Sequence, residues 1–399
     1  MSRISAPGLR RVAQMAIVAL LLPVAACSTA ASQSSTGSAS TATSSGTTTT
    51  SGTWPASPGG TLPLTYSTLS GYQAAVAAAE APVQWHGPTV PVKPPKNAYI
   101  AAIGCAANFS GCTLPLQAAA AAAKAAGVKF TSTNVTNPQD YDQAVQTAIL
   151  NGATAIFYDG GKASLIPVAL KQAQEKHIPV VSAFNDNPAT PGLSYEVDPD
   201  GTAEGQALAD AIIANTNGKP DVLFMNDNEY GLPVLVLAAA MKQLQACTIC
   251  HVTFAQPINF TSAVVNTTLP TTTVSALRAD PSINAVLIGY DPPTTYLIPA
   301  INSAGLKNKA PFYSQLGETL QYISTDNDFK NDTGASVTWA GYAAIDELFR
   351  ALDHQPFVVE NIPFQMFDTQ NVPAGNAPFT GESSANYVEH YLSLWGVTN

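Results

Sequence analysis

The chain has 399 residues, with 17 Lys and Arg against 27 Asp and Glu, which gives a formal net charge of −10. A chain of this length exceeds what one hydrophobic core usually supports, so we expect two domains. The acidic balance argues against binding to nucleic acid and against electrostatic docking on an anionic membrane surface.

The first 26 residues are typical of an export signal. Arg3, Arg10 and Arg11 precede an apolar run from Met15 to Leu22, and small residues follow at 24–26. The apolar run is too short for a permanent membrane span. Removal of residues 1–26 takes away three of the 17 basic residues and no acid, which leaves 14 basic against 27 acidic residues, a net charge of −13.

A cysteine directly after the small residues resembles the signal of a bacterial lipoprotein. The resemblance implies a signal peptide at 1–26, cleavage before Cys27, and lipid (palmitate included) on the sulfur and amine of Cys27. Residues 27–60 are almost all Ser, Thr, Ala and Gly, which cannot bury enough apolar area to offset their ordering entropy. We expect a disordered tether that holds a soluble body on the extracytoplasmic side of the bacterial cell membrane.

Residues 61–96 form a lead-in segment, with a short helix expected at 72–80 and an extended Pro-rich stretch at 82–95. Helix-type and strand-type patterns then alternate, with Asn137 as an N-cap and Gly127 as a helix stop. This order predicts a parallel, right-handed, doubly wound sheet. The expected strands are 97–103, 128–134, 154–158 and a buried run from Ile178, and the expected helices are 115–126, 137–150 and 162–176.

A second series of the same kind follows, so we predict an α/β protein with two doubly wound parallel-sheet lobes joined by a hinge of several crossings. The N-terminal lobe is expected at 97–198 and 316–356, the C-terminal lobe at 199–315 and 357–378, and a tail with a helix at 379–399. The expected strands are 194–197, 221–225, 252–257, 285–289, 312–315, 335–339 and 362–367, and the expected helices are 201–214, 232–245, 272–279, 294–304, 342–352 and 387–395.

Polar and aromatic residues follow the carboxyl ends of five predicted strands, where ligands of open α/β sheets bind. Asp159 follows the third strand, and Asn185 and Asp186 follow the run from Ile178. A carboxylate at the end of a buried strand needs a partner. Asp227 lies in the loop after 221–225. We therefore predict that these four side chains contact one small ligand.

Four cysteines remain besides the lipidation candidate. Export permits disulfides, and close spacing makes Cys105–Cys112 and Cys247–Cys250 the simplest of three pairings. The alternative for the second pair is a redox motif or half of a metal site. The motif falls at the end of a predicted helix, where no helix N-terminus lowers a thiol pKa. His251 adjoins it without a second ligand pair, so we predict structural disulfides and no metal.

Three stretches carry a family resemblance: Asn151–Ile156, Ile178–Val181 and Asp280–Val286 are similar to the motifs "G-vDaii", "iPVv" and "dPdi-av". These motifs belong to the type I periplasmic binding proteins, in particular the ribose- and galactose-binding-like solute receptors of sugar ABC importers. The resemblance covers about 97–373. It implies a Venus-flytrap mechanism, in which lobes close on a small neutral solute and the closed form docks on a permease. We expect a monomer without a cofactor.

The resemblance also implies roles for residues that match the family by position. One group lies where the family's loops hold hydroxyls with carboxylates and amides, and another offers aromatic faces for a sugar ring. These residue types suit a polyol, which needs planar acceptors and donors and a surface for its C–H side. The first group is Asn108, Asp186, Asp291 and Gln315, and the aromatic candidates are Phe184, Tyr230 and Tyr290. Phe109 lies beside Asn108 where the family's first loop reaches the ligand.

One departure from the family concerns arginine. Sugar-binding members often place Arg beside the ligand, but Arg278, in a predicted helix away from the cleft, is the only Arg between Asn97 and Gly305. An anionic ligand is therefore not expected, and the alternative ligands are amine-bearing or aromatic solutes. A second alternative is a lipoprotein that presents its ligand to a membrane signalling partner. The sequence lacks G-x-S-x-G, H-E-x-x-H and Walker A motifs, so we do not expect an enzyme.

Overall fold

The structure, a computed structural model, describes residues 64–107, 109–185, 190–325, 328–360, 362–375 and 377–397. Every described residue lies in one compact unit, Ser51–Asn399. The predictions for the signal peptide, Cys27, the tether, Asn108 and Asp186 therefore fall outside the described residues. Within the described part, no helix combines the length and the hydropathy that a membrane span needs.

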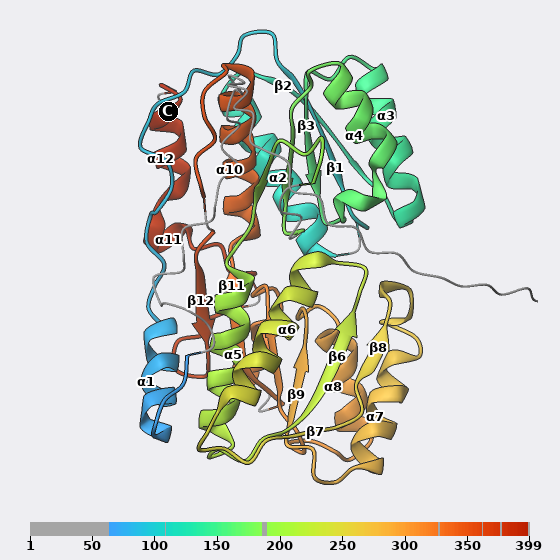
Figure 1. Ribbon diagram of the computed structural model, residues 1–399, viewed down its shortest axis with the longest axis vertical. Helices are drawn as coiled ribbons and strands as arrows, with labels where there is room; N and C mark the ends of the chain where they lie inside the picture. The colour runs from blue at the N-terminus through green and yellow to red at the C-terminus, as the bar shows by residue number, and fades with distance from the viewer. Residues whose placement is uncertain are drawn as a thin grey trace, which may run out of the picture. The chain divides into compact units, whose positions relative to one another are not determined.

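The first sheet has five parallel strands in the order β2-β1-β3-β4-β5 (Figure 1). Strands β3 and β4 are buried along their whole length, as apolar strands covered on both faces are. Strand β2 is an edge strand and is largely exposed. The strands are β1 Tyr99–Gly104, β2 Lys129–Asn134, β3 Ala155–Asp159, β4 Val180–Ala183 and β5 Tyr195–Val197.

Helices cover both faces of this sheet. Alternate residues of β1 enter different cores: Ile100 and Ala102 join one hydrophobic cluster, and Ala101 and Ile103 join the other. Helix α10 packs on α2 and on β3, β4 and β5, whereas α3 packs on α4 and β1. The helices are α2 Ser110–Ala125, α3 Tyr141–Leu150, α4 Pro167–Glu175 and α10 Val337–Leu352, with short 3₁₀ turns η1 Pro138–Asp140 and η2 Ala163–Leu165.

The second sheet has the order β12-β11-β10-β9-β6-β7, and β8 pairs with a further stretch of β6. All pairs are parallel except that between β11 and β12. Together with the first sheet, this confirms the predicted class of two doubly wound α/β lobes. The strands are β6 Asp221–Asp227, β7 Thr253–Phe254, β8 Ile258–Phe260, β9 Ala285–Ile288, β10 Phe312–Gln315, β11 Phe329–Ala335 and β12 Phe364–Phe367.

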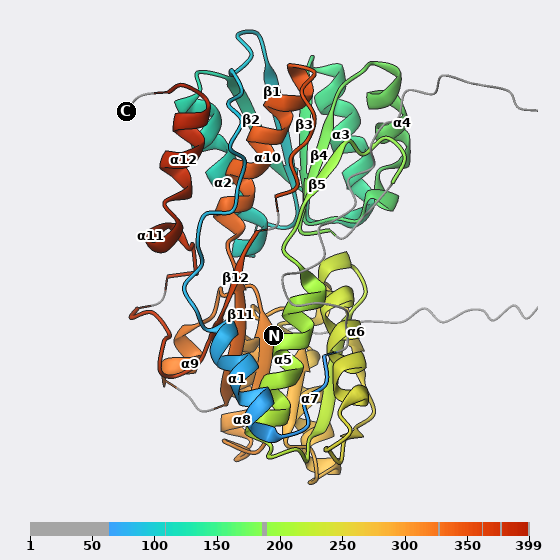
Figure 2. The same cartoon turned by 60° about the vertical axis from the view of Figure 1, so that its left-hand side comes forward.

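The second sheet has its own helices, and one comes from the lead-in segment. Helix α1 packs on α5 and β12, α5 packs on α6, and α7 packs on α8 (Figures 1 and 2). The elements are α1 Leu69–Ala79, α5 Gly201–Asn215, α6 Gly231–Ala246, η3 Ser262–Val264, α7 Leu269–Ala279, α8 Thr294–Ser303 and α9 Gln321–Thr325.

The structure corrects the prediction between the two lobes. Residues 335–339 were expected to form a strand that returns to the first lobe, and 316–356 were assigned to that lobe. Instead β11 ends at Ala335 and pairs with β10 and β12 in the second sheet. Helix α10 starts at Val337 because the Ser336 hydroxyl caps it by accepting from the Trp339 N–H. Of the segment 316–356, the part from α10 onward is the part that packs on the first sheet.

The boundaries of two further elements, a helix and a strand, differ from those predicted from the sequence. Helix α2 begins at Ser110, not at Pro115, and Pro115 lies inside it, where it removes one backbone hydrogen bond. The segment 252–257 was expected to form one strand. It forms β7 alone, and β8 follows at Ile258 beyond Pro257, which cannot donate to a ladder.

Aromatic rings join the lead-in segment to α10 and α12. The Trp85 indole stacks on Trp339, at 5.5 Å between ring centroids, and on His390, at 4.6 Å. Trp395 is buried, and its indole N–H donates to Asp346 Oδ1 at 2.7 Å. The two helices of this segment are α11 Glu382–Ala385 and α12 Tyr387–Leu394, and α12 packs on α10.

Candidate functional site

A cavity lies where strands of both sheets end at their carboxyl sides. It receives residues that follow β1, β3 and β4 of the first sheet and β6, β9 and β10 of the second. Its volume is about 70 Å³, roughly half of the ~150 Å³ of an apolar cavity that holds benzene. Its lining residues are Cys105, Phe109, Gly111, Cys112, Asp159, Gly160, Phe184, Tyr230, Leu232, Pro233, Tyr290, Pro292, Gln315, Leu316, Glu318 and Val337.

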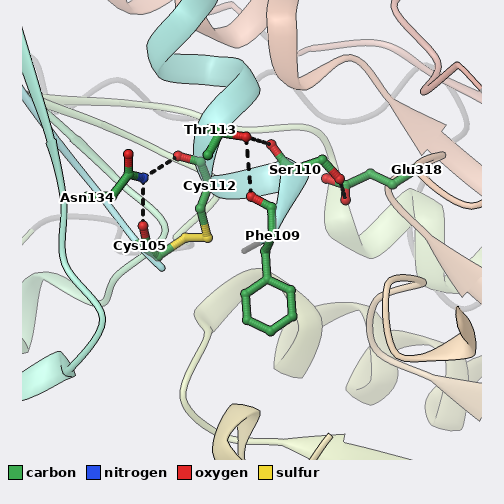
Figure 3. Close-up of a disulfide and its surroundings, with 7 residues drawn as sticks. All are labelled: Cys105, Phe109, Ser110, Cys112, Thr113, Asn134 and Glu318. Atoms are coloured by element: carbon green, nitrogen blue, oxygen red, sulfur yellow. Dashed lines mark hydrogen bonds between the residues drawn. A yellow bond between two sulfur atoms is a disulfide. The ribbon is translucent and has the colours of Figure 1, made fainter. Parts of the chain in front are cut away.

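The wall from the first sheet is built around a disulfide. Cys105 is bonded to Cys112, the pairing predicted from their spacing. The Asn134 amide donates to the carbonyls of Cys105 and Cys112 at 2.7 and 3.0 Å, which fixes the loop between β1 and α2. The Phe109 ring points away from this disulfide (Figure 3). The other predicted pair, Cys247–Cys250, is also bonded; it lies after α6 and does not line the cavity.

Asp159 ends β3 and reaches the cavity with an uncompensated carboxyl group. It is 0 % exposed, and neither carboxylate oxygen has a hydrogen-bond partner among the described residues. Burial, and then the charge of Glu318, raises the pKa of Asp159 well above its ordinary value. Gly160 follows with φ +68°, and a Cβ there would lie 2.2 Å from Cys105 Sγ, so the turn requires glycine.

Glu318 is the charged lining residue that the sequence analysis missed. Its Oε2 accepts a hydrogen bond from the Ser110 hydroxyl, so the bond joins α2 to the loop after β10 (Figure 3). Its Oε1 has no partner among the described residues, and a Cβ on Gly111 would lie 2.6 Å from it. Burial, followed by the charge of Asp291, raises the pKa of Glu318 to about 8. The cavity therefore holds two acids with three carboxylate oxygens that lack a partner among the described residues.

Asp291 was expected to contact ligand, but it holds the loop that carries Glu318. Its Oδ2 accepts from the backbone N–H groups of Glu318 and Thr319, at 2.7 and 2.6 Å, and from the Thr319 hydroxyl at 3.0 Å. It is fully buried and does not line the cavity. Burial raises the pKa of Asp291 to about 7, against the opposing effect of these hydrogen bonds.

Asp227 likewise lies one contact behind the cavity. Its Oδ2 accepts from the Tyr290 hydroxyl at 2.7 Å, and its Oδ1 accepts from the Glu229 N–H at 2.9 Å. Burial raises the pKa of Asp227 to about 6. Tyr290 meets Tyr230 edge to face at 5.7 Å between ring centroids. Asp227 thus orients Tyr290, which in turn packs against Tyr230.

Two lining residues have backbone conformations that side chains rarely adopt. Phe184 has φ +59° and Leu316 has φ +106°. Non-glycine residues with positive φ store strain, and such strain collects at ligand sites. Gln315, next to Leu316, donates from its amide to the Gly289 carbonyl at 2.9 Å and also lines the cavity. These turns direct side chains inward from β4 and β10.

The structure separates the predicted ligand residues into four groups. Some line the cavity, some support lining residues, and one is buried elsewhere: Asn185, whose backbone N–H donates to Asp198 at 3.2 Å and whose amide atoms have no described partner. Two lie outside the described residues. The residues outside the described part are Asn108 and Asp186, and those that support lining residues are Asp227 and Asp291. The residues that line the cavity are Phe109, Asp159, Phe184, Tyr230, Tyr290 and Gln315.

A larger hollow of about 530 Å³ lies between β1, β2 and α3 on the first sheet. Its lining is mostly threonine, asparagine and alanine, and Asp140 is its one charged residue. It takes no residue from the second sheet and no aromatic residue except Tyr99. The strand-end cavity, which combines aromatic rings with buried acids, is the better candidate for a solute site.

Two doubly wound lobes with a cavity at the carboxyl ends of both sheets define a class, the bilobed solute-binding proteins. The family model for the periplasmic binding protein domain matches residues 108–356, more than half of the chain. The protein therefore belongs to the periplasmic binding protein family, as the motifs at 151–156, 178–181 and 280–286 predicted, and its fold is of type I.

Solved structures share this fold at low sequence identity. An ABC sugar transporter subunit from Rhodobacter sphaeroides gives a TM-score of 0.62 at 18% identity and covers 69% of this chain and 100% of its own. A solute-binding protein from Agrobacterium vitis with bound allitol gives a TM-score of 0.63 at 18% identity and covers 70% of this chain and 98% of its own. A 5-methylthioribose transporter solute-binding protein from Thermotoga lettingae gives a TM-score of 0.60 at 18% identity and covers 77% of this chain and 95% of its own. None of the curated proteins matches the sequence.

Proposed function

We propose that the protein is an extracytoplasmic solute-binding lipoprotein that captures a small sugar or polyol in the strand-end cavity and delivers it to an ABC importer. The observation that carries this proposal is the lining, which joins carboxyl groups and the Gln315 amide to four aromatic rings at the ends of both sheets. Such groups hold hydroxyls and the C–H face of a polyol. The proteins of similar fold with bound allitol and 5-methylthioribose support the same class of ligand.

The proposed mechanism is capture by closure. Because the cavity is about 70 Å³, a sugar-sized ligand requires its two walls to move apart. The Ser110–Glu318 bond and the bond from Lys162 Nζ to the Asn228 carbonyl, at 2.6 Å, join residues of the two lobes and would break when the walls move apart to admit the solute. The monomeric closed form then presents both lobes to the permease, and the solute leaves chemically unchanged.

The location rests on the N-terminal sequence. Lipid on Cys27 and the Ser/Thr-rich tether would hold the body at the membrane from outside the cytoplasm. Replacing Cys27 with Ala should move the protein from the membrane fraction to the soluble fraction and remove labelling by a palmitate analogue. Labelled Cys27→Ala protein that stayed with the membrane would contradict the anchor.

Ligand capture is tested by the thermal stability of the full chain with a panel of sugars and polyols. A ligand at 100 times its Kd should stabilise the protein by about 2.7 kcal/mol, a shift of a few degrees in Tm. NMR of the recovered ligand should show no conversion. A panel without any stabilising sugar, polyol or derivative of these, or a converted ligand, would contradict the proposal.

A further inference from the structure

The strand-end cavity contains negative charge without a matching positive charge. Asp159 and Glu318 line it, and Asp227 and Asp291 lie directly behind it. None of its described lining residues is Lys, Arg or His. Lys162 is near, but its ammonium is engaged with the Asn228 carbonyl at 2.6 Å and is not part of the lining.

Three of the four carboxylate oxygens of the two lining acids also lack a neutral partner among the described residues. Both oxygens of Asp159 and one oxygen of Glu318 have no hydrogen-bond partner among the described residues, although both side chains are buried. A buried ionised carboxylate without a partner is strongly unfavourable, so such groups pair with a cation or take up a proton. The described part of the chain supplies no cation to this lining, which leaves the position for a group from outside.

The remaining walls suit a positive group as well. The rings of Phe109, Phe184, Tyr230 and Tyr290 surround the same cavity. Aromatic faces attract ammonium groups, and the attraction grows when the cation is desolvated. An anionic solute would meet carboxylates and ring faces, both of which repel it, and no Lys, Arg or His among the described lining residues.

We propose that the solute carries a protonated amine, an aminosugar or aminopolyol whose ammonium lies between Asp159 and Glu318 and against the aromatic walls. This inference rests on the proposed function, because it takes the strand-end cavity as the solute site and the solute as a hydroxylated molecule. It adds that the cation, and not the hydroxyl pattern alone, is recognised.

Proton release follows from this arrangement. Without a bound cation, burial raises the pKa of both Asp159 and Glu318. The two acids face each other as like charges, and Asp291 and Asp332 add further negative charge near Glu318. Among the described residues, the Ser110 hydroxyl is the one donor to Glu318. An ammonium favours the ionised forms, so its binding displaces protons from the carboxyl groups. Affinity for the amine should therefore rise with pH up to the range in which these acids ionise.

The test compares matched solutes by calorimetry with the full chain at pH 7.5. The pairs are glucamine against sorbitol and glucosamine against glucose, which differ in one amine for one hydroxyl. The alkylammonium of glucamine keeps its charge at this pH, whereas the less basic amine of glucosamine is only partly protonated, so the proton balance is measured with glucamine. We expect the amine to bind at least about tenfold more tightly, as a hydrogen bond to a charged group implies. Titration in two buffers of different ionisation enthalpy should show that protons are released. Equal affinities within a pair, or binding without proton release, would overturn the inference.

Isosteric variants identify the acids. Asp159→Asn and Glu318→Gln should each weaken glucamine binding about 10- to 100-fold and change sorbitol binding little. The control Glu175→Gln removes the same charge from an exposed position on α4 and should bind glucamine as the parent does. Unchanged glucamine affinity in both cavity variants would overturn the inference.

The two proposals fail separately. If sorbitol or glucose binds as tightly as its amine, the cation is not recognised and the sugar-binding function stands. If a hydroxyl-free amine such as cyclohexylamine binds as tightly as glucamine, the cation is recognised and the sugar or polyol class is wrong. If no member of either series binds, the proposed function fails as well.

Discussion

Buried acids occur in two regions of this molecule, and their surroundings differ. On α10 and the segment after it, Asp346, Glu347 and Glu360 lie together, close enough to share a metal ion. Here the chain supplies a cation and at least one partner for each acid: Arg350 Nε bonds to Asp346 at 2.6 Å, the Val358 N–H donates to Glu347 at 2.9 Å, and the Tyr391 hydroxyl donates to Glu360. One oxygen each of Glu347 and Glu360 has no partner among the described residues. In the strand-end cavity, Asp159 has no partner among the described residues and Glu318 has one.

Burial raises the pKa of acids in both regions, to about 9 for Glu347 and to about 8 for Glu318. A raised pKa alone therefore does not distinguish a structural acid from a binding acid. The partners distinguish them, because an acid with a cation and donors from its own chain is part of the fold. An acid that faces a cavity without such partners is available to a ligand.

Removing Arg350 should have the largest effect on stability. Arg350→Met leaves three buried acids without their cation and should cost about 3–5 kcal/mol, a fall in Tm on the order of 10 °C. Lys171→Met, an exposed position on α4, is the matched control and should change the free energy of unfolding by less than about 0.5 kcal/mol. Thermal and urea denaturation measure both. A loss below about 1 kcal/mol for Arg350→Met would remove the contrast between the two regions.

Neutralising one acid in each region should give opposite results. Asp346→Asn weakens the bond to Arg350 and should cost about 2 kcal/mol. Asp159→Asn removes an unpaired buried carboxyl group and should leave stability unchanged or raise it by up to about 1 kcal/mol. The free energies of unfolding in urea at pH 7.5 compare the two variants directly. If Asp159→Asn is the more destabilising, Asp159 is a structural acid and the comparison is wrong.

The sequence predicted the fold well where both faces of a strand are buried. The run from Ile178 is such a case: it contains β4, Val180–Ala183, which is buried throughout, and Phe184 directly after it lines the strand-end cavity. Strand β11 was missed because Lys330-Asn331-Asp332 has no apolar alternation; it is buried only because β10 and β12 flank it. Val337 was taken for strand because the cap at Ser336 was not recognised.

The candidate site was predicted in part, because a sequence pattern gives the position of a side chain and not its direction. Asp159 and Tyr290 follow strands and point into the cavity, whereas Asp291, one residue further, turns back to hold a loop. Glu318 lies three residues beyond β10, after two residues with positive φ. That turn carries it to Ser110, and only the three-dimensional structure reveals the approach.

The pH dependence of stability sharpens the comparison within the cavity. The pKa of Glu318 is raised to about 8 in the folded protein, against about 4.3 in an unfolded chain. The folded state therefore holds more protons, so this group's contribution to stability is lost as pH rises from about 4 to about 8. Glu318→Gln should make the free energy of unfolding fall less steeply with rising pH, by at most about 1.4 kcal/mol per pH unit. Urea unfolding of both proteins from pH 5 to 8.5 measures the difference, and parallel curves would contradict it.

The smallest effect is expected at the edge of the cavity. Lys162 is partly exposed, and its charge lowers the pKa of Asp227 only as the weakest of several influences. Lys162→Met should change stability by less than about 1 kcal/mol and strengthen glucamine binding less than about fivefold, because a like charge is removed. Calorimetric titration with glucamine at 50 and 500 mM salt measures the affinity, and urea unfolding measures the stability. A tenfold loss of affinity would show that Lys162 orders the site.

The aromatic stack around Trp85 determines what an optical experiment on this protein reports. Trp85, Trp339 and Trp395 are three of the four tryptophans, and none of them lines the cavity. Intrinsic tryptophan emission from the folded body therefore follows the attachment of the lead-in segment and α12 to α10. Solute capture should therefore change tryptophan emission little, and the fluorescence of Tyr230 and Tyr290, which line the cavity, should report it instead.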